Sequence, residues 1–229
     1  MLLDFDGSLA EIVARPELAA PVEGAREVLA SLVERYRVVA LVTGRRSQEV
    51  EAMLGVPGVR ILGVYGLEDL EPPHTPPELL ERARAAAALV PEAWVEDKGV
   101  SVAVHFRQAP DPLRARATLL EALEPTAADA GRDVVEGKMV LELMPPGRPH
   151  KGGAVERLVA ELGLAAVLFA GDDVADLDAF AALDRVDGPG LLAVRVAVQG
   201  PETPVELLEA ADLVVPGPVG LVALLRQLA

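Results

Sequence analysis

Two groups of aspartates, separated by most of the chain, each follow a short apolar stretch that is typical of a buried strand. The run DFDGSL occupies residues 4–9 and follows apolar residues 1–3, whereas the run GDDVAD occupies residues 171–176 and follows residues 166–170. In an open sheet of parallel strands, side chains at the carboxyl ends meet at one crevice. The two groups therefore restrict the chain to folds that bring both strand ends to one sheet edge.

Carboxylates that gather at one sheet edge repel each other, so without a cation some of them would stay protonated. Mg²⁺ prefers hard oxygen ligands and keeps water molecules that a substrate phosphate can replace. We therefore expect Mg²⁺ as the cofactor at this edge.

The composition narrows the class of function. The chain has 229 residues, a formal net charge of −15 and no cysteine. This acidity argues against a nucleic acid or an anionic membrane as partner, whereas a small phosphorylated metabolite stays compatible because a bound cation reverses the local charge. No apolar run is long enough to span a bilayer and no signal peptide is visible, so we expect a cytoplasmic protein. We also expect a monomer.

Lysine is rare in this chain. Three lysines accompany 18 arginines, and they are Lys98, Lys138 and Lys151. Such a bias indicates that arginine has replaced lysine wherever either cation serves. The three lysines are therefore candidates for places that need a compact ammonium group.

Strand and helix patterns alternate over most of the chain, which predicts an α/β fold built on a parallel sheet. Besides the two strands above, strands are expected at residues 37–42, 59–64 and 191–198. Helices are expected at residues 23–36, 47–54, 77–90, 151–162, 174–183 and 219–228. Residues 187–190 and 200–204 have the composition of loops.

The pattern changes in the middle of the chain. Two predicted hairpins, at residues 93–106 and 133–144, flank a helix expected at residues 111–123 with proline in its first turn. This arrangement predicts a small antiparallel α+β domain, residues 93–146, inserted into a core made of residues 1–92 and 147–229.

The acid pair and three other residues fit phosphoryl transfer. Asp4 can attack phosphorus as a nucleophile, and Asp6 can protonate the leaving oxygen and then activate water. Thr43 at a strand end and Lys151 at a helix start can bind phosphoryl oxygens, and Gly7 permits close backbone approach. Each feature alone also fits an ordinary turn or helix start, but together they are specific.

This order of residues resembles the haloacid dehalogenase superfamily of phosphohydrolases, over nearly the whole chain. The resemblance implies a Rossmann-like parallel-sheet core with helices on both faces and a mobile inserted cap like that of the Cof-type branch. It implies that Asp4 is the nucleophile, that Asp6 is the general acid and base, and that Thr43 and Lys151 bind phosphate. The metal ligands that it implies are Asp4, Asp6 through its carbonyl oxygen, and Asp172, with Asp173 and Asp176 beside them.

Longer segments resemble trehalose-6-phosphate phosphatases. They are VYGLE at residues 64–68, DKGVSVAVHFR at 97–107, GKMVLEL at 137–143 and GDDVADLDAF at 171–180. The resemblance implies a Mg²⁺-dependent hydrolase that converts trehalose 6-phosphate to trehalose and phosphate through an aspartyl-phosphate, within trehalose biosynthesis. Candidate sugar-binding residues of the cap are Lys98, His105, Arg107, Lys138 and Glu142.

Three alternatives stay open. One is a related sugar phosphatase that acts on sucrose 6-phosphate or a glycosyl-phosphoglycerate. Another is a sugar-phosphate sensor without catalysis, although a pure binder has no need of both a nucleophile and an adjacent acid. The third is a receiver-like signalling domain that stores phosphate on an aspartate, which explains neither Asp6 nor the inserted domain.

Overall fold

The computed structural model describes all residues except 14, 71–73, 148–149 and 187–189. The chain divides into two compact units. The first consists of Met1–Gly66 and His150–Ala229, and the second of Leu67–Pro149. Most of the loop expected at residues 187–190 lies outside the described residues.

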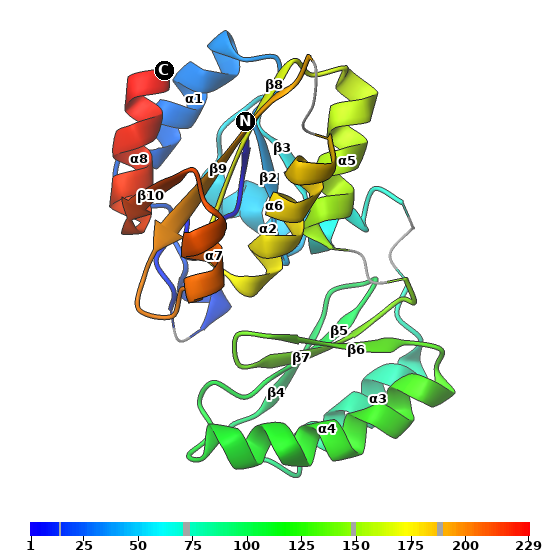
Figure 1. The fold of residues 1–229 in the computed structure, drawn as a ribbon. Helices are drawn as coiled ribbons and strands as arrows, with labels where there is room; N and C mark the ends of the chain where they lie inside the picture. The colour runs from blue at the N-terminus through cyan, green and yellow to red at the C-terminus, as the bar shows by residue number, and fades with distance from the viewer. Residues whose placement is uncertain (14, 71–73, 148–149, 187–189) are drawn as a thin grey trace. The chain divides into compact units, whose positions relative to one another are not determined.

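The first unit is built on a six-stranded sheet in which every neighbouring pair is parallel (Figure 1). Its strands, in spatial order, are β10 (Leu213–Pro216), β9 (Leu192–Gln199), β8 (Ala166–Gly171), β1 (Leu2–Leu3), β2 (Ala40–Val42) and β3 (Arg60–Leu62). β1 and β8 are neighbours, with Leu3 opposite Ala170. The two strands that lead into the aspartate groups therefore end side by side.

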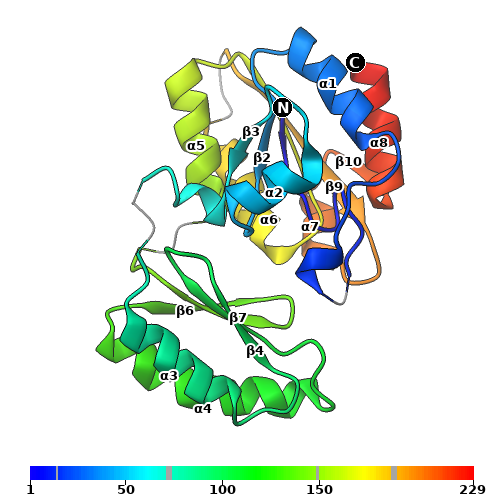
Figure 2. The ribbon, with the colours of Figure 1, turned by 180° about the vertical axis from the view of Figure 1, so that it is seen from behind.

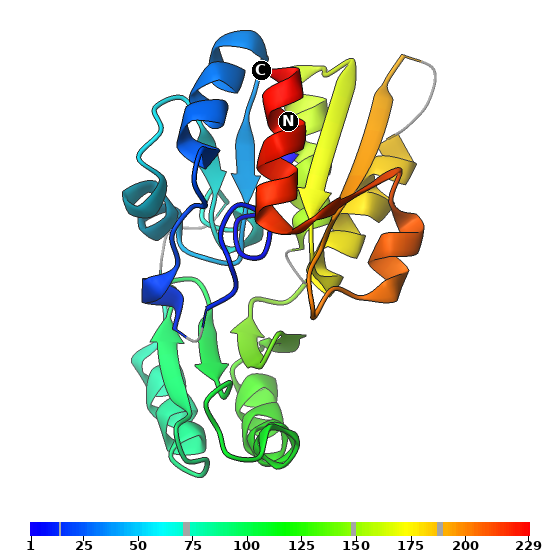
Figure 3. The ribbon, with the colours of Figure 1, turned by 90° about the vertical axis from the view of Figure 1, so that its left-hand side faces the viewer.

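Helices cover both faces of this sheet, as the alternating pattern predicted (Figures 2 and 3). Residues of α1 (Ala25–Arg35), α2 (Ser47–Leu54) and α8 (Gly217–Leu228) share one apolar core with the sheet. Residues of α5 (Lys151–Leu162), α6 (Val174–Val186) and α7 (Val205–Ala210) share the other. Side chains alternate along β1, so Leu2 enters one core and Leu3 the other. Burial on both faces explains why the strands read as continuous apolar runs.

The second unit is a four-stranded antiparallel sheet. Its spatial order is β4 (Trp94–Asp97), β5 (Val102–His105), β7 (Val140–Met144) and β6 (Asp133–Gly137). β4 pairs with β5 and β6 with β7, so both predicted hairpins are confirmed. α3 (Pro77–Ala87) and α4 (Pro112–Asp129) share an apolar core with these strands.

The second unit starts earlier than the boundary expected at residue 93. Leu79 and Ala83 of α3 are buried together with Val104 of β5 and Leu119 of α4. The alanine-rich pattern of α3 predicts a helix with a narrow apolar face, but it does not indicate which sheet that face covers. The sequence pattern therefore assigns this helix to the core, whereas in the structure it packs in the second unit.

Several described elements differ from the sequence expectations, of which α4, α7 and β10 are examples. α4 continues to Asp129, beyond the expected end at residue 123, although Pro125 cannot donate a backbone hydrogen bond. α7 and β10 were not expected, because a six-residue helix and a four-residue edge strand leave too few repeats for a periodic signal.

Among the described helices, none combines the length and the hydropathy required to cross a membrane.

Candidate active site

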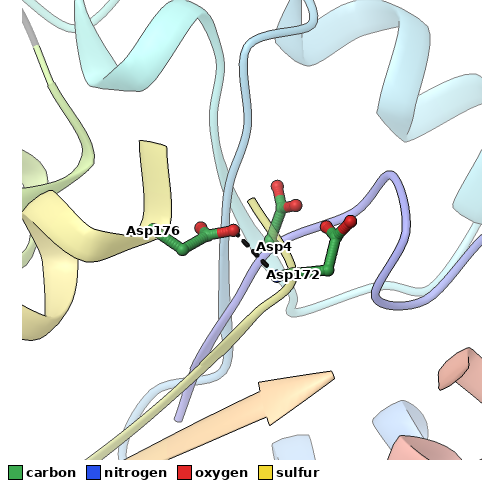
Figure 4. A group of neighbouring side chains, drawn as sticks. All are labelled: Asp4, Asp172 and Asp176. Carbon is green, nitrogen blue, oxygen red and sulfur yellow. Dashed lines mark hydrogen bonds between the residues drawn. The ribbon is translucent and has the colours of Figure 1, made fainter. Parts of the chain in front are cut away.

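Three carboxylates from separate segments converge in the first unit (Figure 4). Asp4 follows β1, Asp172 follows β8 and Asp176 lies in the first turn of α6. Each offers one oxygen, and these oxygens all lie within 4.8 Å of one another. All three residues are buried. Buried oxygen donors at this spacing fit a divalent cation such as Mg²⁺, which would offset the repulsion between the carboxylates.

Lys151, the first residue of α5, lies among these acids. Its Nζ is 2.6 Å from Oδ1 of Asp4 and 2.7 Å from Oδ1 of Asp176, and its side chain is only 4% exposed. Burial alone lowers the pKa of Lys151, but Asp176 and Asp4 raise it by more, so its pKa lies above the usual value. The ammonium group therefore stays charged.

Asp4 has a strongly perturbed acidity. Burial raises the pKa of Asp4 well above its usual value; the ammonium of Lys151 opposes this shift, and Asp176 and Asp172 add to it. One ammonium among three carboxylates leaves an excess of negative charge. A cation bound here would favour the ionised form of Asp4, which is the form that can act as a nucleophile.

Asp176 also fixes the turn that carries Asp172. Its Oδ2 accepts hydrogen bonds from the backbone N–H groups of Asp172 and Asp173, both at 2.9 Å (Figure 4 shows the first). Gly171 leaves room for this carboxylate, since a Cβ there would lie 2.1 Å from Cγ of Asp176. The Oδ1 of Asp173 accepts from the backbone N–H of Val174. Among the described residues, the group of carboxylates that could hold a metal does not include Asp173, which the sequence resemblance places beside the metal ligands.

The side chain of Asp6 is directed to a different partner. Its carboxylate accepts hydrogen bonds from Nε and Nη2 of Arg45, at 2.6 and 2.7 Å. It is not part of the three-carboxylate cluster, which leaves only the expected role of its carbonyl oxygen as a link to the metal. No sequence pattern indicated a role for Arg45, although this residue directly follows Thr43 and Gly44.

Thr43 is fixed at the end of β2. It is buried, and its Oγ1 accepts a hydrogen bond of 3.1 Å from the backbone N–H of Arg45. A hydroxyl that accepts this bond keeps its own hydrogen for an acceptor such as a phosphoryl oxygen. The backbone oxygens of Thr43 and Arg45 accept from Tyr65 and Val64, both at 2.8 Å. Val64 and Tyr65 both adopt the left-handed φ region, at 45° and 58°, so this turn is held in a costly conformation.

Gly7 contacts the carboxylate of Asp172. Its φ is +81°, and a Cβ there would lie 2.2 Å from Oδ2 of Asp172. Gly55 provides a matched control, because its φ is +62° and a Cβ there has no atom of the described chain within 4 Å. Both substitutions incur a left-handed penalty of about 1 kcal/mol, but only one displaces a candidate metal ligand.

We therefore expect Gly7→Ala to reduce phosphatase activity about a hundredfold and Gly55→Ala to leave it unchanged. Steady-state kinetics and urea unfolding of both variants measure the two effects. Equal losses of activity in the two variants would contradict the role given to the contact between Gly7 and Asp172.

The candidate sugar-binding residues belong to the second unit, where two of them form a buried pair. Nζ of Lys98 is 3.1 Å from Oε2 of Glu142, and both side chains are buried. The hydroxyl of Ser101 donates to Oε1 of the same carboxylate. Lys98, like Lys151, is thus a buried and ion-paired lysine, whereas Lys138 is only partly buried.

His105 and Glu142 lie on the same face of the antiparallel sheet. Ala103 pairs with Glu142, and His105 is two residues further along β5. The opposite face carries Val104, which packs in the core with α3 and α4. The ring of His105 stacks on Trp94, with centroids 4.1 Å apart.

His105 and Arg107 make further polar contacts within the second unit. Nε2 of His105 lies 2.7 Å from Oε2 of Glu96, for which no sequence motif indicated a role. Nη2 of Arg107 donates to the backbone oxygen of Lys138 at 3.3 Å. The sugar-binding roles of all five candidates stay predictions.

The model of the trehalose-phosphatase family matches residues 2–208. The chain belongs to the trehalose-phosphatase family. The trehalose-phosphate phosphatase of Mycobacterium avium (strain 104) is 32% identical over 220 residues, which cover 87% of this chain and 54% of that protein. The probable trehalose-phosphate phosphatase of Sinorhizobium fredii is 31% identical over 218 residues, which cover 89% of this chain and 78% of that protein.

Some of the relatives are much longer than this chain. An uncharacterized glycosyl hydrolase of Mycobacterium tuberculosis is 34% identical over 212 residues, which cover 84% of this chain and 16% of that protein. The chain thus spans about half of the mycobacterial phosphatase above and a small part of the glycosyl hydrolase.

Solved structures show the same fold. The C-terminal domain of Candida albicans trehalose-6-phosphate phosphatase has a TM-score of 0.80 at 22% identity and covers 99% of this chain and 90% of that one. A haloacid dehalogenase-like hydrolase from Bacteroides thetaiotaomicron has a TM-score of 0.63 at 18% identity, with 100% and 98% covered. The predicted fold class, a Rossmann-like core with an inserted unit, is therefore confirmed.

Proposed function

We propose that this chain is a Mg²⁺-dependent phosphomonoesterase that hydrolyses trehalose 6-phosphate to trehalose and phosphate. The observation that carries the chemistry is the buried group of Asp4, Asp172, Asp176 and Lys151 at the ends of two adjacent parallel strands. Membership of the trehalose-phosphatase family supports the choice of sugar phosphate.

In the first step, a carboxylate oxygen of Asp4 attacks phosphorus. The new bond joins this oxygen to phosphorus, and the bond between phosphorus and the sugar oxygen breaks. Asp6 donates a proton to the departing sugar oxygen, so that trehalose leaves as a neutral alcohol. Asp4 then carries the phosphoryl group as an aspartyl-phosphate.

In the second step, water attacks the phosphorus of the aspartyl-phosphate. Asp6, now ionised, accepts a proton from this water, and the bond between Asp4 and phosphorus breaks. Inorganic phosphate leaves, and both carboxyl groups return to their starting states. The two steps thus use one nucleophile and one group that acts first as acid and then as base.

The remaining residues offset the charge of the phosphoryl group. Lys151 places a buried positive charge beside Asp4, and Thr43 offers a hydroxyl hydrogen. Asp4, Asp172 and Asp176, with the carbonyl oxygen of Asp6, are the groups that would hold Mg²⁺. When bound, Mg²⁺ would supply positive charge that stabilises the transferring phosphoryl group.

Recognition of the sugar is assigned to polar residues of the second unit. We propose that the residues that bind sugar hydroxyls are Lys98, His105, Arg107, Lys138 and Glu142. The buried pair of Lys98 and Glu142 supports this choice, because both side chains are held in fixed positions on a sheet. Carboxylate and ammonium groups held in this way can exchange their hydrogen bonds for those of sugar hydroxyls.

A sensor without catalysis is the second candidate. The C-terminal domain of the Candida albicans trehalose synthase regulatory protein shares the fold, with a TM-score of 0.68 at 13% identity. The fold therefore also occurs in a protein named for regulation. The presence of both Asp4 and Asp6 in this chain favours the enzyme.

A panel of phosphorylated sugars tests the proposal. Free phosphate is measured with trehalose 6-phosphate, sucrose 6-phosphate, glucose 6-phosphate and a glycosyl-phosphoglycerate, in Mg²⁺ and in EDTA. We expect the highest kcat/KM for trehalose 6-phosphate in Mg²⁺. In EDTA, we expect no release of phosphate from any of these substrates. A higher kcat/KM for another sugar would overturn the substrate, and phosphate release from none of them would favour the sensor.

A further inference from the structure

Arg45 holds the carboxylate of Asp6 in a two-pronged ion pair. Nε of Arg45 donates to Oδ2 at 2.6 Å, and Nη2 donates to Oδ1 at 2.7 Å. A guanidinium fork and a carboxylate match in this way only when the two groups are coplanar, so the pair fixes orientation as well as distance. The side chain of Asp6 is 37% exposed, whereas that of Arg45 is 10% exposed.

Arg45 is itself held in place on several sides. Its Nη1 donates to the backbone oxygen of Pro16 at 2.9 Å, and its guanidinium carbon lies 5.8 Å from the centroid of the Phe5 ring. Its backbone N–H donates to Thr43, and its backbone oxygen accepts from Val64. The arginine is thus anchored by its backbone, by Nη1 and by its contact with the ring of Phe5. It can therefore act as a fixed support for the more exposed Asp6.

Asp6 is not part of the three-carboxylate cluster, so contacts within that cluster do not fix the orientation of its carboxylate. A carboxylate on a turn rotates among several staggered positions unless a neighbour restricts it. Each of its oxygens has two lone pairs, and Arg45 occupies one on each. The remaining lone pairs can exchange a proton with the leaving sugar oxygen or with water while the group keeps its orientation.

We propose that Arg45 is a positioning residue that holds the carboxylate of Asp6 in one orientation for its two proton transfers. This inference rests on the proposed function, in which Asp6 transfers the proton in both steps. Arg45 acts on the reaction through Asp6, whereas Lys151 and Thr43 act on the phosphoryl oxygens. Removal of Arg45 therefore lowers kcat and leaves substrate binding unchanged.

A double-mutant cycle tests this route of action. The variants are Arg45→Met, which keeps the aliphatic stem and removes the fork, Asp6→Asn, and the two combined. With trehalose 6-phosphate and Mg²⁺, we expect Arg45→Met to lower kcat about tenfold to a hundredfold with KM within about twofold of wild type. In the Asp6→Asn background, the same substitution should change the residual rate less than about twofold. The same loss in both backgrounds would overturn the proposal.

Inhibition by inorganic phosphate gives a second readout, which does not depend on the residual rate of Asp6→Asn. Arg45 is proposed to contact Asp6 and not the phosphoryl group. The inhibition constant of inorganic phosphate should therefore be the same for Arg45→Met as for the wild type. A rise of about tenfold in this constant would show direct phosphate binding and overturn the proposal. Arg45→Lys, which cannot form the fork, should resemble Arg45→Met in kcat.

Arg26→Met is the matched control for a merely structural effect. Arg26 donates to the backbone oxygens of Leu54 and Met53, at 2.9 and 2.7 Å, and these lie at the end of the helix that follows Arg45. It should lower the thermal stability without lowering kcat of the folded enzyme. If the wild-type chain releases no phosphate from any sugar, both the proposed function and this inference are overturned. If the wild type is active but the effects of Arg45→Met and Asp6→Asn on the rate are additive, only the inference is overturned.

Discussion

Lys151→Met is expected to abolish phosphatase activity and to destabilise the protein by about 3–5 kcal/mol. The substitution removes the ammonium that lies 2.6 Å from Asp4 and 2.7 Å from Asp176, and it leaves two buried carboxylates without this partner. Breaking one side of a buried ion pair costs far more than breaking a pair on the surface, because the remaining charge has lost its hydration. Urea unfolding in EDTA measures the loss.

A surface ion pair in the same unit provides the control for Lys151→Met. Nη1 of Arg60 lies 3.0 Å from Oε1 of Glu161, and both side chains are well exposed. Arg60→Met should cost less than about 1 kcal/mol and keep full activity. If Lys151→Met cost no more than Arg60→Met, the buried charge cluster would not have the structure described for it.

Asp4→Asn is expected to lower kcat by at least about 10⁴-fold and to make the metal-free protein more stable at neutral pH. The first effect follows because an amide oxygen does not form the covalent intermediate. The second follows from charge, because the substitution removes one of three buried acids and leaves Lys151 paired with Asp176. Few substitutions are expected to remove activity and raise stability together.

The pH dependence of this stabilisation has a definite sign. Burial raises the pKa of Asp4 in the folded state, so the folded protein keeps this proton to a higher pH than the unfolded chain does. As the pH rises above the usual range of an aspartate, the unfolded state therefore binds fewer protons and the folded state loses stability. The advantage of Asp4→Asn in EDTA should grow over this range and vanish at acidic pH, where Asp4 is protonated in both states.

Thermal unfolding across pH, with and without Mg²⁺, measures this difference. Saturating Mg²⁺ should stabilise the wild type more than the variant, since the cation binds the ionised carboxylates. A variant that is less stable than wild type in EDTA at neutral pH would contradict the account of Asp4 as a strained buried acid.

The core of the site could be predicted from the sequence because its parts follow strands. Asp4 and Asp172 each follow an apolar run, and a parallel sheet brings such positions to one edge wherever the strands are neighbours. The short first strand was also visible, since only three residues precede Asp4 and the structure gives β1 two of them. The helix start at Lys151 follows from the apolar periodicity of residues 151–162.

Two features of the structure could not be read from local pattern. The ion pair of Asp6 and Arg45 joins residues 39 positions apart, and its geometry depends on the turn at Val64 and Tyr65, which no periodicity indicates. The assignment of α3 to the second unit depends on which sheet its alanine-rich face meets. Both are decided by tertiary packing rather than by propensity.

The most direct test of the central claim is to trap the phosphorylated protein. Wild-type chain is mixed rapidly with trehalose 6-phosphate and Mg²⁺, quenched in acid, reduced with borohydride and digested, and the modified residue is identified by peptide mass spectrometry. The account predicts that reduction converts Asp4, and no other aspartate, to homoserine, and that the modification is absent in EDTA. Modification at another residue, or turnover without any modified Asp4, would contradict it.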